Sequence, residues 1–101
     1  FFKDAKFDWP QGLTFDQVDN KLYICDTFNN LIRVADLNQS KVETLCGNKL
    51  NTIIGDYDYK GGKKGIEQTI SSPWDLCLFH KDNSKILLIA CAGTHQIWLY
   101  S

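Results

Sequence analysis

Residues 22–34 read LYICDTFNNLIRV, two apolar runs separated by a short polar turn. The turn contains Asp26, Thr27, Asn29 and Asn30, and Asn and Asp tolerate turn geometry because their side chains bond back to the local backbone. The flanking runs, residues 21–26 and 31–37, have the length and apolar character of strands. This stretch therefore predicts two antiparallel strands joined at the turn.

The same alternation of short strand and turn extends in both directions. Residues 12–16 form a β-prone run before a turn at residues 18–20, and residues 41–46 form another after a turn at residues 38–40. Four strands at roughly 8–12-residue spacing predict an antiparallel meander. We find no convincing amphipathic helix and expect an all-β fold.

A second copy of this pattern follows the first. Residues 9–13 correspond to residues 72–76 at an offset of 63, and residues 22–24 correspond to residues 87–89 at an offset of 65. The two extra residues fit the hairpin at residues 80–84, because an insertion in a surface hairpin costs little. The second copy stops at Ser101 after three strands.

The repeat suggests how the chain is organised. Its offset exceeds the roughly 40–45 residues of a four-stranded blade, and the excess lies in a polar, glycine-containing connection. We expect residues 1–101 to be a fragment of one domain. The expected parts are a blade over residues 7–47, a long inter-blade loop over residues 48–69 and a partial second blade over residues 70–101.

The strands are apolar on consecutive residues. The runs LYIC (22–25), DLCLF (75–79) and KILLIACA (85–92) do not alternate, although a sheet with one wet face would. Both faces should therefore be covered, as when blades pack side by side around a ring. Because fewer than two blades cannot supply that cover, we expect the segment alone to expose its sheet faces and to self-associate or aggregate.

The composition limits the kind of protein and the kind of partner to be expected. The chain has 101 residues, is 44% hydrophobic and has a formal net charge of -1, so it is typical of a globular protein and gives no sign of a polyanionic or membrane partner. No apolar stretch approaches the roughly 18 residues that cross a bilayer. No secretory signal is visible, and since no Met is present we expect a piece of a longer protein.

The cysteines indicate a reducing setting. They form no C-x-x-C pair, which excludes a zinc ribbon or a thioredoxin-type redox motif within the segment. Each lies in an apolar run, where a thiol behaves as a small buried hydrophobe, so we predict reduced structural thiols and a cytoplasmic location, with a disulfide as the alternative. The four positions are Cys25, Cys46, Cys77 and Cys91.

The repeated residues also resemble a known family. Residues 7–13, 22–34 and 42–47 look like one NHL repeat, while residues 61–65, 70–75 and 92–98 (GGKKG, ISSPWD and AGTHQIW) resemble the NHL-repeat-containing protein 2 family more specifically. In that family a thioredoxin-like domain precedes an NHL β-propeller. The resemblance implies four-stranded antiparallel β-meander blades of an NHL β-propeller, here an incomplete ring of about one and three-quarter blades.

The chain departs from the family pattern at two places. The family usually has His and then a basic residue after Asp-Thr-x-Asn, where this chain has Asn30 and Leu31. A role for that basic residue is therefore not carried over to the first blade. The thioredoxin-like part is absent from these residues, so no redox activity is carried over either.

Topology indicates which loops share a face. In an up-and-down blade the connection entering the first strand and the turn between the second and third strands lie at the same end. Residues 9–10, 47–69 and 73–75 should therefore share a face with residues 26–30 and 92–95, and loops on a rigid scaffold commonly carry recognition. The candidate binding residues are Trp9, Asp26, Asn29, Asn30, Trp74, Asp75, Thr94 and His95.

Each candidate also has a structural interpretation. Asp26 and Asn29 can simply hold the turn through side-chain-to-backbone hydrogen bonds, and Trp9 and Trp74 can pack at the blade entrance. A metal or general-base role for His95 is disfavoured, because no carboxylate or second His stands at a helpful spacing. We predict no catalytic residue, metal site or cofactor.

The leading functional hypothesis follows from the resemblance. It is a non-catalytic propeller segment that serves as a protein–protein interaction scaffold, with protein partners and the neighbouring blades of the parent chain as its contacts. One alternative is a segment of an NHL-type metal-dependent enzyme, a lyase or lactonase-like hydrolase, whose metal ligands would come from several blades. The other is an RNA-binding NHL propeller, which would need a basic surface that the near-neutral charge does not suggest.

Overall fold

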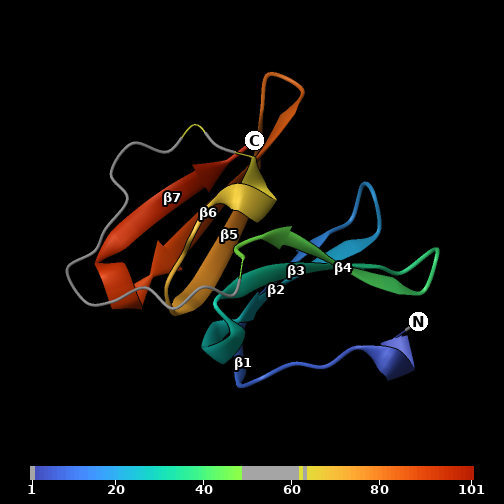
Figure 1. Cartoon of the computed structure of the whole chain (residues 1–101). Coiled ribbons are helices and arrows are strands. Elements are labelled where there is room, and N and C mark those ends of the chain that lie inside the picture. The colour runs from blue at the N-terminus through green and yellow to red at the C-terminus, as the bar shows by residue number, and fades with distance from the viewer. Residues whose placement is uncertain (1, 49–61, 63) are drawn as a thin grey trace.

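The computed structural model describes residues 2–48, 62 and 64–101, and these form two antiparallel sheets that lie side by side (Figure 1). In each sheet the strands follow one another in chain order. The first sheet comprises β1 (Pro10–Asp16), β2 (Lys21–Asp26), β3 (Leu31–Asp36) and β4 (Lys41–Cys46). The second comprises β5 (Pro73–Lys81), β6 (Ser84–Cys91) and β7 (Gln96–Tyr100). The expected all-β architecture of meander blades in an incomplete ring is confirmed.

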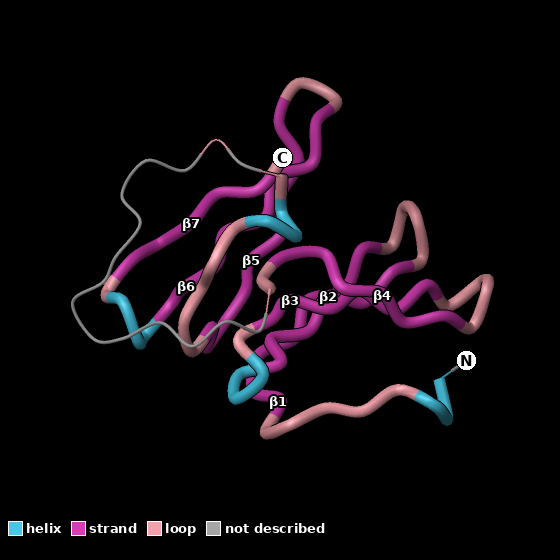
Figure 2. The backbone as a smooth tube through the Cα atoms, in the orientation of Figure 1, coloured by secondary structure: helices cyan, strands magenta, loops and turns pink. Residues whose placement is uncertain are grey.

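The helical segments of the described residues are four short 3-10 turns (Figure 2). They are η1 (Phe2–Asp4), η2 (Thr27–Asn29), η3 (Gly65–Glu67) and η4 (Ala92–Thr94). None of the helices in this part of the chain has the length and apolar character required to span a membrane.

The strand bounds agree closely with those expected from the sequence. β2 and β4 match the prediction, whereas β1 begins two residues earlier, at Pro10, and β3 ends one residue earlier, at Asp36. Strand β3 ends there because the Asp36 carboxylate accepts hydrogen bonds from the backbone N–H groups of Asn38 and Gln39 and starts the turn. Proline is tolerated at the first residue of β1 because a strand start need not donate to the ladder.

The second sheet repeats the first in backbone conformation. Asn30 and His95, 65 residues apart, both adopt the left-handed region with φ of 57° and 54°. Trp9 and Ser72, 63 residues apart, share it with φ of 55° and 47°. The longer hairpin between β5 and β6 accommodates the two extra residues, as expected. The offset of 63 also relates η1 to η3, so the segment that enters each blade is repeated as well.

The main apolar core lies between the two sheets, which approach each other most closely along β1, β2 and β5. Each fully buried aliphatic side chain contributes about 1.5–3 kcal/mol to folding, so this interface is a principal source of stability. The first sheet contributes Tyr23, Cys25, Ile32 and Cys46, the second Leu76, Leu87, Ile89 and Cys91, and the entering segment Ile70. The sheets therefore pack as two adjacent blades.

The outward faces of both sheets are open in this segment. Ile97 and Leu99 on β7 are 74% and 61% exposed, and Leu13 and Phe15 on β1 are also exposed. By the repeat offset, Ile97 occupies the position of Ile32, which the first sheet buries against the second. The face of the second sheet thus repeats a blade-contact face without its neighbour. The expectation that the segment alone exposes its sheet faces is confirmed.

Three of the four cysteines behave as predicted. All four are free, and Cys25, Cys46 and Cys91 are buried between the sheets. Burial raises the pKa of Cys25 and Cys46 to about 12 and that of Cys91 to about 11, so these thiols stay protonated and unreactive. Cys77 is free as predicted, but its predicted burial is wrong: it is exposed because the face of β5 that carries it has no covering sheet.

Most of the predicted inter-blade loop, residues 48–69, lies outside the described residues, so its bounds stay a prediction. Its last part is packed against the first blade. The backbone N–H of Gly47 donates to the carbonyl oxygen of Gly65 over 3.0 Å, and the Gln68 side chain is buried. The segment entering the second blade is therefore part of the folded interface.

Candidate functional site

Four segments gather at one end of the two sheets, and we call this end the loop face. It comprises residues 8–11, 26–30, 71–75 and 92–95. Backbone hydrogen bonds join them: Phe28 N–H donates to the Asp8 carbonyl oxygen over 3.1 Å, and Ala92 N–H donates to that of Ser72 over 3.0 Å. In Figure 2 the turns η2 and η4 lie at this end and the strand hairpins at the other. The shared face predicted from topology is therefore present in these segments.

Two side chains connect the loops of the two blades. The hydroxyl of Thr27, which is fully buried, donates to the carbonyl oxygen of Pro73 over 2.7 Å. The Asn30 side-chain oxygen accepts from the Ser72 N–H over 2.8 Å. Because both bonds run from η2 to the start of β5, they fix the position of one loop relative to the other.

Asp26 holds the turn from inside and has no exposed surface. Its carboxylate accepts from the Asp8 N–H over 2.8 Å and from the Asn29 side-chain amide over 2.9 Å, and it pairs with the Arg33 guanidinium at 3.4 Å. That guanidinium in turn lies over the Phe7 ring, 5.5 Å from its centroid. These contacts are those expected if Asp26 and Asn29 serve to hold the turn.

The second repeat builds the same turn without charge. Cys91 stands at the position of Asp26 and Trp98 at that of Arg33, by the offset of 65. The Cys91 thiol is hydrogen-bonded by the Ser71 backbone, as the Asp26 carboxylate is by that of Asp8. The ion pair is thus replaced by a thiol and an indole in an equivalent setting. The offset of 65 alone could have revealed that Cys91 and Trp98 replace the ion pair. The groups that contact each pair are seen only in the structure.

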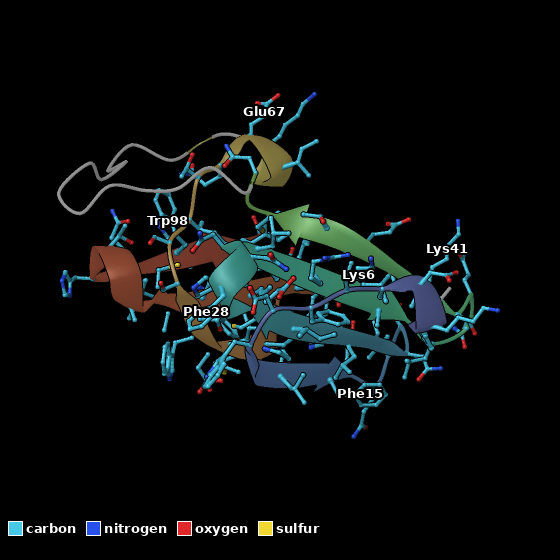
Figure 3. All side chains as sticks on the ribbon, turned by 60° about the horizontal axis from the view of Figure 1, so that its bottom comes forward. Lys6, Phe15, Phe28, Lys41, Glu67 and Trp98 are labelled. Atoms are coloured by element: carbon cyan, nitrogen blue, oxygen red, sulfur yellow. The ribbon has the colours of Figure 1, made fainter. Side chains whose placement is uncertain are left out.

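An aromatic pair stands on the surface of the loop face. The rings of Trp9 and Phe28 are stacked, with centroids 5.3 Å apart and planes at 22°. These residues remain 59% and 57% exposed, and Trp74 is 49% exposed. Figure 3 shows Phe28 beside the turn that follows β2, at the opposite end of that sheet from Phe15. We call Trp9 and Phe28 the aromatic stack. Sequence reasoning did not select Phe28, because its contact with Trp9 depends on the loop bonds.

The remaining candidates lie on the second blade. Asp75 is exposed and lies against the first blade, since a Cβ built on Gly12 would come within 2.7 Å of its Cα and of Oδ1. Thr94 is buried within η4, while His95 is exposed at its left-handed end. The structure therefore groups Trp9, Asp26, Asn29 and Asn30 around η2. It places Trp74 and Asp75 at the start of β5, and Thr94 and His95 at η4.

Other features of the described residues lie apart from these candidates. A small cavity of about 60 Å³ lies between β4 and β7, and its lining includes Cys46, Gln68 and Trp98 but none of the eight candidates. Among the described residues no three His, Cys, Asp or Glu side chains stand close enough to hold a metal ion.

The packed meander blades and their repeated loop face define the class of the chain: it is a segment of a β-propeller. No family model matches it. It is 46% identical over 99% of its length to protein SUPPRESSOR OF QUENCHING 1, chloroplastic, from Arabidopsis thaliana. It is 44% identical over 96% of its length to human NHL repeat-containing protein 2. The resemblance to the NHL repeat-containing protein 2 family is therefore confirmed.

The chain is much shorter than these relatives. It spans 9% of the plant protein and 13% of the human one. A structural genomics protein of unknown function from Bacteroides thetaiotaomicron superposes with a TM-score of 0.73 at 28% identity, over 97% of this chain and 22% of that protein. The match extends through both blades, so their arrangement recurs within a larger molecule.

Proposed function

We propose that this segment is a non-catalytic part of a β-propeller whose loop face binds protein partners. The aromatic stack of Trp9 and Phe28 carries the proposal, because it is exposed on loops that inter-blade hydrogen bonds hold in place. Exposed Trp side chains are frequent hot spots of protein interfaces, and a preorganised surface binds without an ordering cost.

The other groups of the loop face favour a structural role over chemistry. Asp26, Thr27 and Asn30 use their side chains in hydrogen bonds that fix the turn and the neighbouring blade. The protonated thiols between the sheets are poor nucleophiles. Because all four cysteines are unpaired, we include a cytoplasmic, reducing location in the proposal.

Trp9→Ser and Phe28→Gly in the intact protein test this function. The second repeat has Ser72 and Gly93 at these positions, and Ser72 adopts the same left-handed backbone as Trp9, so both variants should fold. We expect partners captured by the unaltered protein to be lost from both variants. Val18→Ser, at a hairpin on the opposite end, is the control. An unchanged set of partners in both loop-face variants would reject the proposal.

A further inference from the structure

The two ends of the segment differ in charge. The loop face contains Asp8, Asp26 and Asp75 and no Lys or Arg. The hairpin end, residues 16–21, 36–41 and 80–85, contains four aspartates and four lysines and is balanced. Acidic character is therefore concentrated at the end that carries the aromatic stack, although the net charge of the chain is only -1.

One of these three aspartates, Asp8, is exposed next to the aromatic stack. Asp8 precedes Trp9, and its backbone bonds to both Asp26 and Phe28, so it is held next to the stack. Asp75 packs on Gly12 of the first blade, and its carboxylate accepts from the Leu76 N–H over 2.9 Å. Its equivalent, Gly12, is buried by the next blade, so a following blade should cover Asp75. Asp26 is already paired with Arg33 inside the turn. The accessible charge of the loop face is thus the Asp8 carboxylate, next to the exposed rings of the stack.

The internal repeat shows that this position need not be sealed in a complete ring. Ser71, Ser72 and Gly93 are the equivalents of Asp8, Trp9 and Phe28, and their preceding blade is present in the structure. All three are half-buried, and the Ser72 N–H is hydrogen-bonded to Asn30 of that blade, so they stay partly exposed beside it. A blade before the first sheet would accordingly leave the aromatic stack partly accessible.

We propose that the loop face binds an arginine- or lysine-bearing segment of a partner protein, with the cation against the aromatic stack and the Asp8 carboxylate beside it. This inference rests on the proposed function of the loop face. Stacking uses one face of each ring, and a cation is attracted to a free aromatic face. The nearby carboxylate strengthens that attraction and repels nucleic acid phosphates, so a basic peptide is favoured over RNA.

A pair of peptides tests the charge requirement on the intact protein. One is a blocked peptide of alternating glycine and arginine, and the other has citrulline, which is neutral and of similar shape, in place of each arginine. We expect tryptophan fluorescence to report binding of the arginine peptide, weakening as salt is added because the charges are screened. The citrulline peptide should bind about tenfold more weakly or not at all. Equal binding of both peptides would overturn the inference.

The double variant D8S/W9S tests the location. It converts Asp-Trp-Pro at residues 8–10 into Ser-Ser-Pro, the sequence already present at residues 71–73. Binding of the arginine peptide, followed by calorimetry, should weaken about tenfold in D8S/W9S and stay unchanged in V18S. Unaltered binding by D8S/W9S contradicts the inference.

The two proposals fail in different ways. If W9S loses its protein partners but the intact protein binds neither peptide, the loop face is an interaction surface and the cation preference is wrong. If W9S and F28G keep all partners, the interaction function itself is wrong, whatever the peptides show.

Discussion

The buried hydroxyl of Thr27 donates a hydrogen bond of 2.7 Å to the carbonyl oxygen of Pro73 and so joins the turn of one blade to the first strand of the next. Pro73 is fully buried as well, so water cannot replace the donor easily. The bond crosses the interface between the two blades, and the apolar core extends that interface along the sheets.

Replacing Thr27 with Val keeps the shape of the side chain and removes the donor. The Pro73 carbonyl then stays buried without its partner, which costs about 1–3 kcal/mol. Urea unfolding of the intact protein should show this loss for T27V and a smaller one for T27S, which retains the hydroxyl. Equal stability of T27V and the unaltered protein would show that the bond contributes nothing.

The Asp26–Arg33 pair should behave differently when one or both members change. Arg33→Met leaves a buried carboxylate without its cation and should destabilise the intact protein by about 3 kcal/mol. The double variant D26C/R33W installs the pair that the second repeat uses, Cys91 and Trp98, and should recover part of that loss. Denaturant midpoints of D26C, R33W and D26C/R33W measure the coupling. Simple additivity would contradict the equivalence of the two turns.

A charged contact at the hairpin end makes stability depend on pH. The Lys85 ammonium lies 2.6 Å from the buried Asp16 carboxylate and also contacts that of Asp19. Burial alone would raise the pKa of Asp16, but hydrogen bonding from Lys85 and from the Val18 N–H outweighs it, and the pKa lies below its ordinary value.

Because the folded state lowers this pKa, its contribution is present at neutral pH and disappears as the carboxylate is protonated in acid. Asp16→Asn should cost about 1–2 kcal/mol at neutral pH, and the difference should shrink below a pH of about 4. Asp36→Asn is a matched control, since Asp36 bonds its turn in the same way and is half-exposed. A D16N loss that persists in acid would contradict the ion-pair explanation.

Much of the fold could be predicted from the sequence, because its signals are local. The polar turn at residues 26–30 and the apolar runs beside it identify β2 and β3, and the repeat offset identifies the second blade. The loops of the shared face follow from strand order alone. The stacking of Trp9 on Phe28 could not be predicted, since it requires the bond between Phe28 and Asp8.

The burial of individual residues was equally hard to predict. Cys77 lies in an apolar run like the other cysteines, and its exposure depends on which face of β5 meets the first sheet. The contribution of Ile70 to the core depends on how the entering segment crosses the interface. Such facts follow from the packing of one blade on another, which no single strand encodes.

The reactivity of Cys77 in the intact protein tests the central claim most directly. Cys77 occupies the position of Thr14 on a face that repeats the buried blade contact, so a following blade should cover it. Pulse labelling with a maleimide, read by mass spectrometry, should modify Cys77 far more slowly in the native intact protein than in the same protein unfolded by urea. Equally fast labelling in both states would show that this face is open to water, and the packing of neighbouring blades on both sides would be refuted.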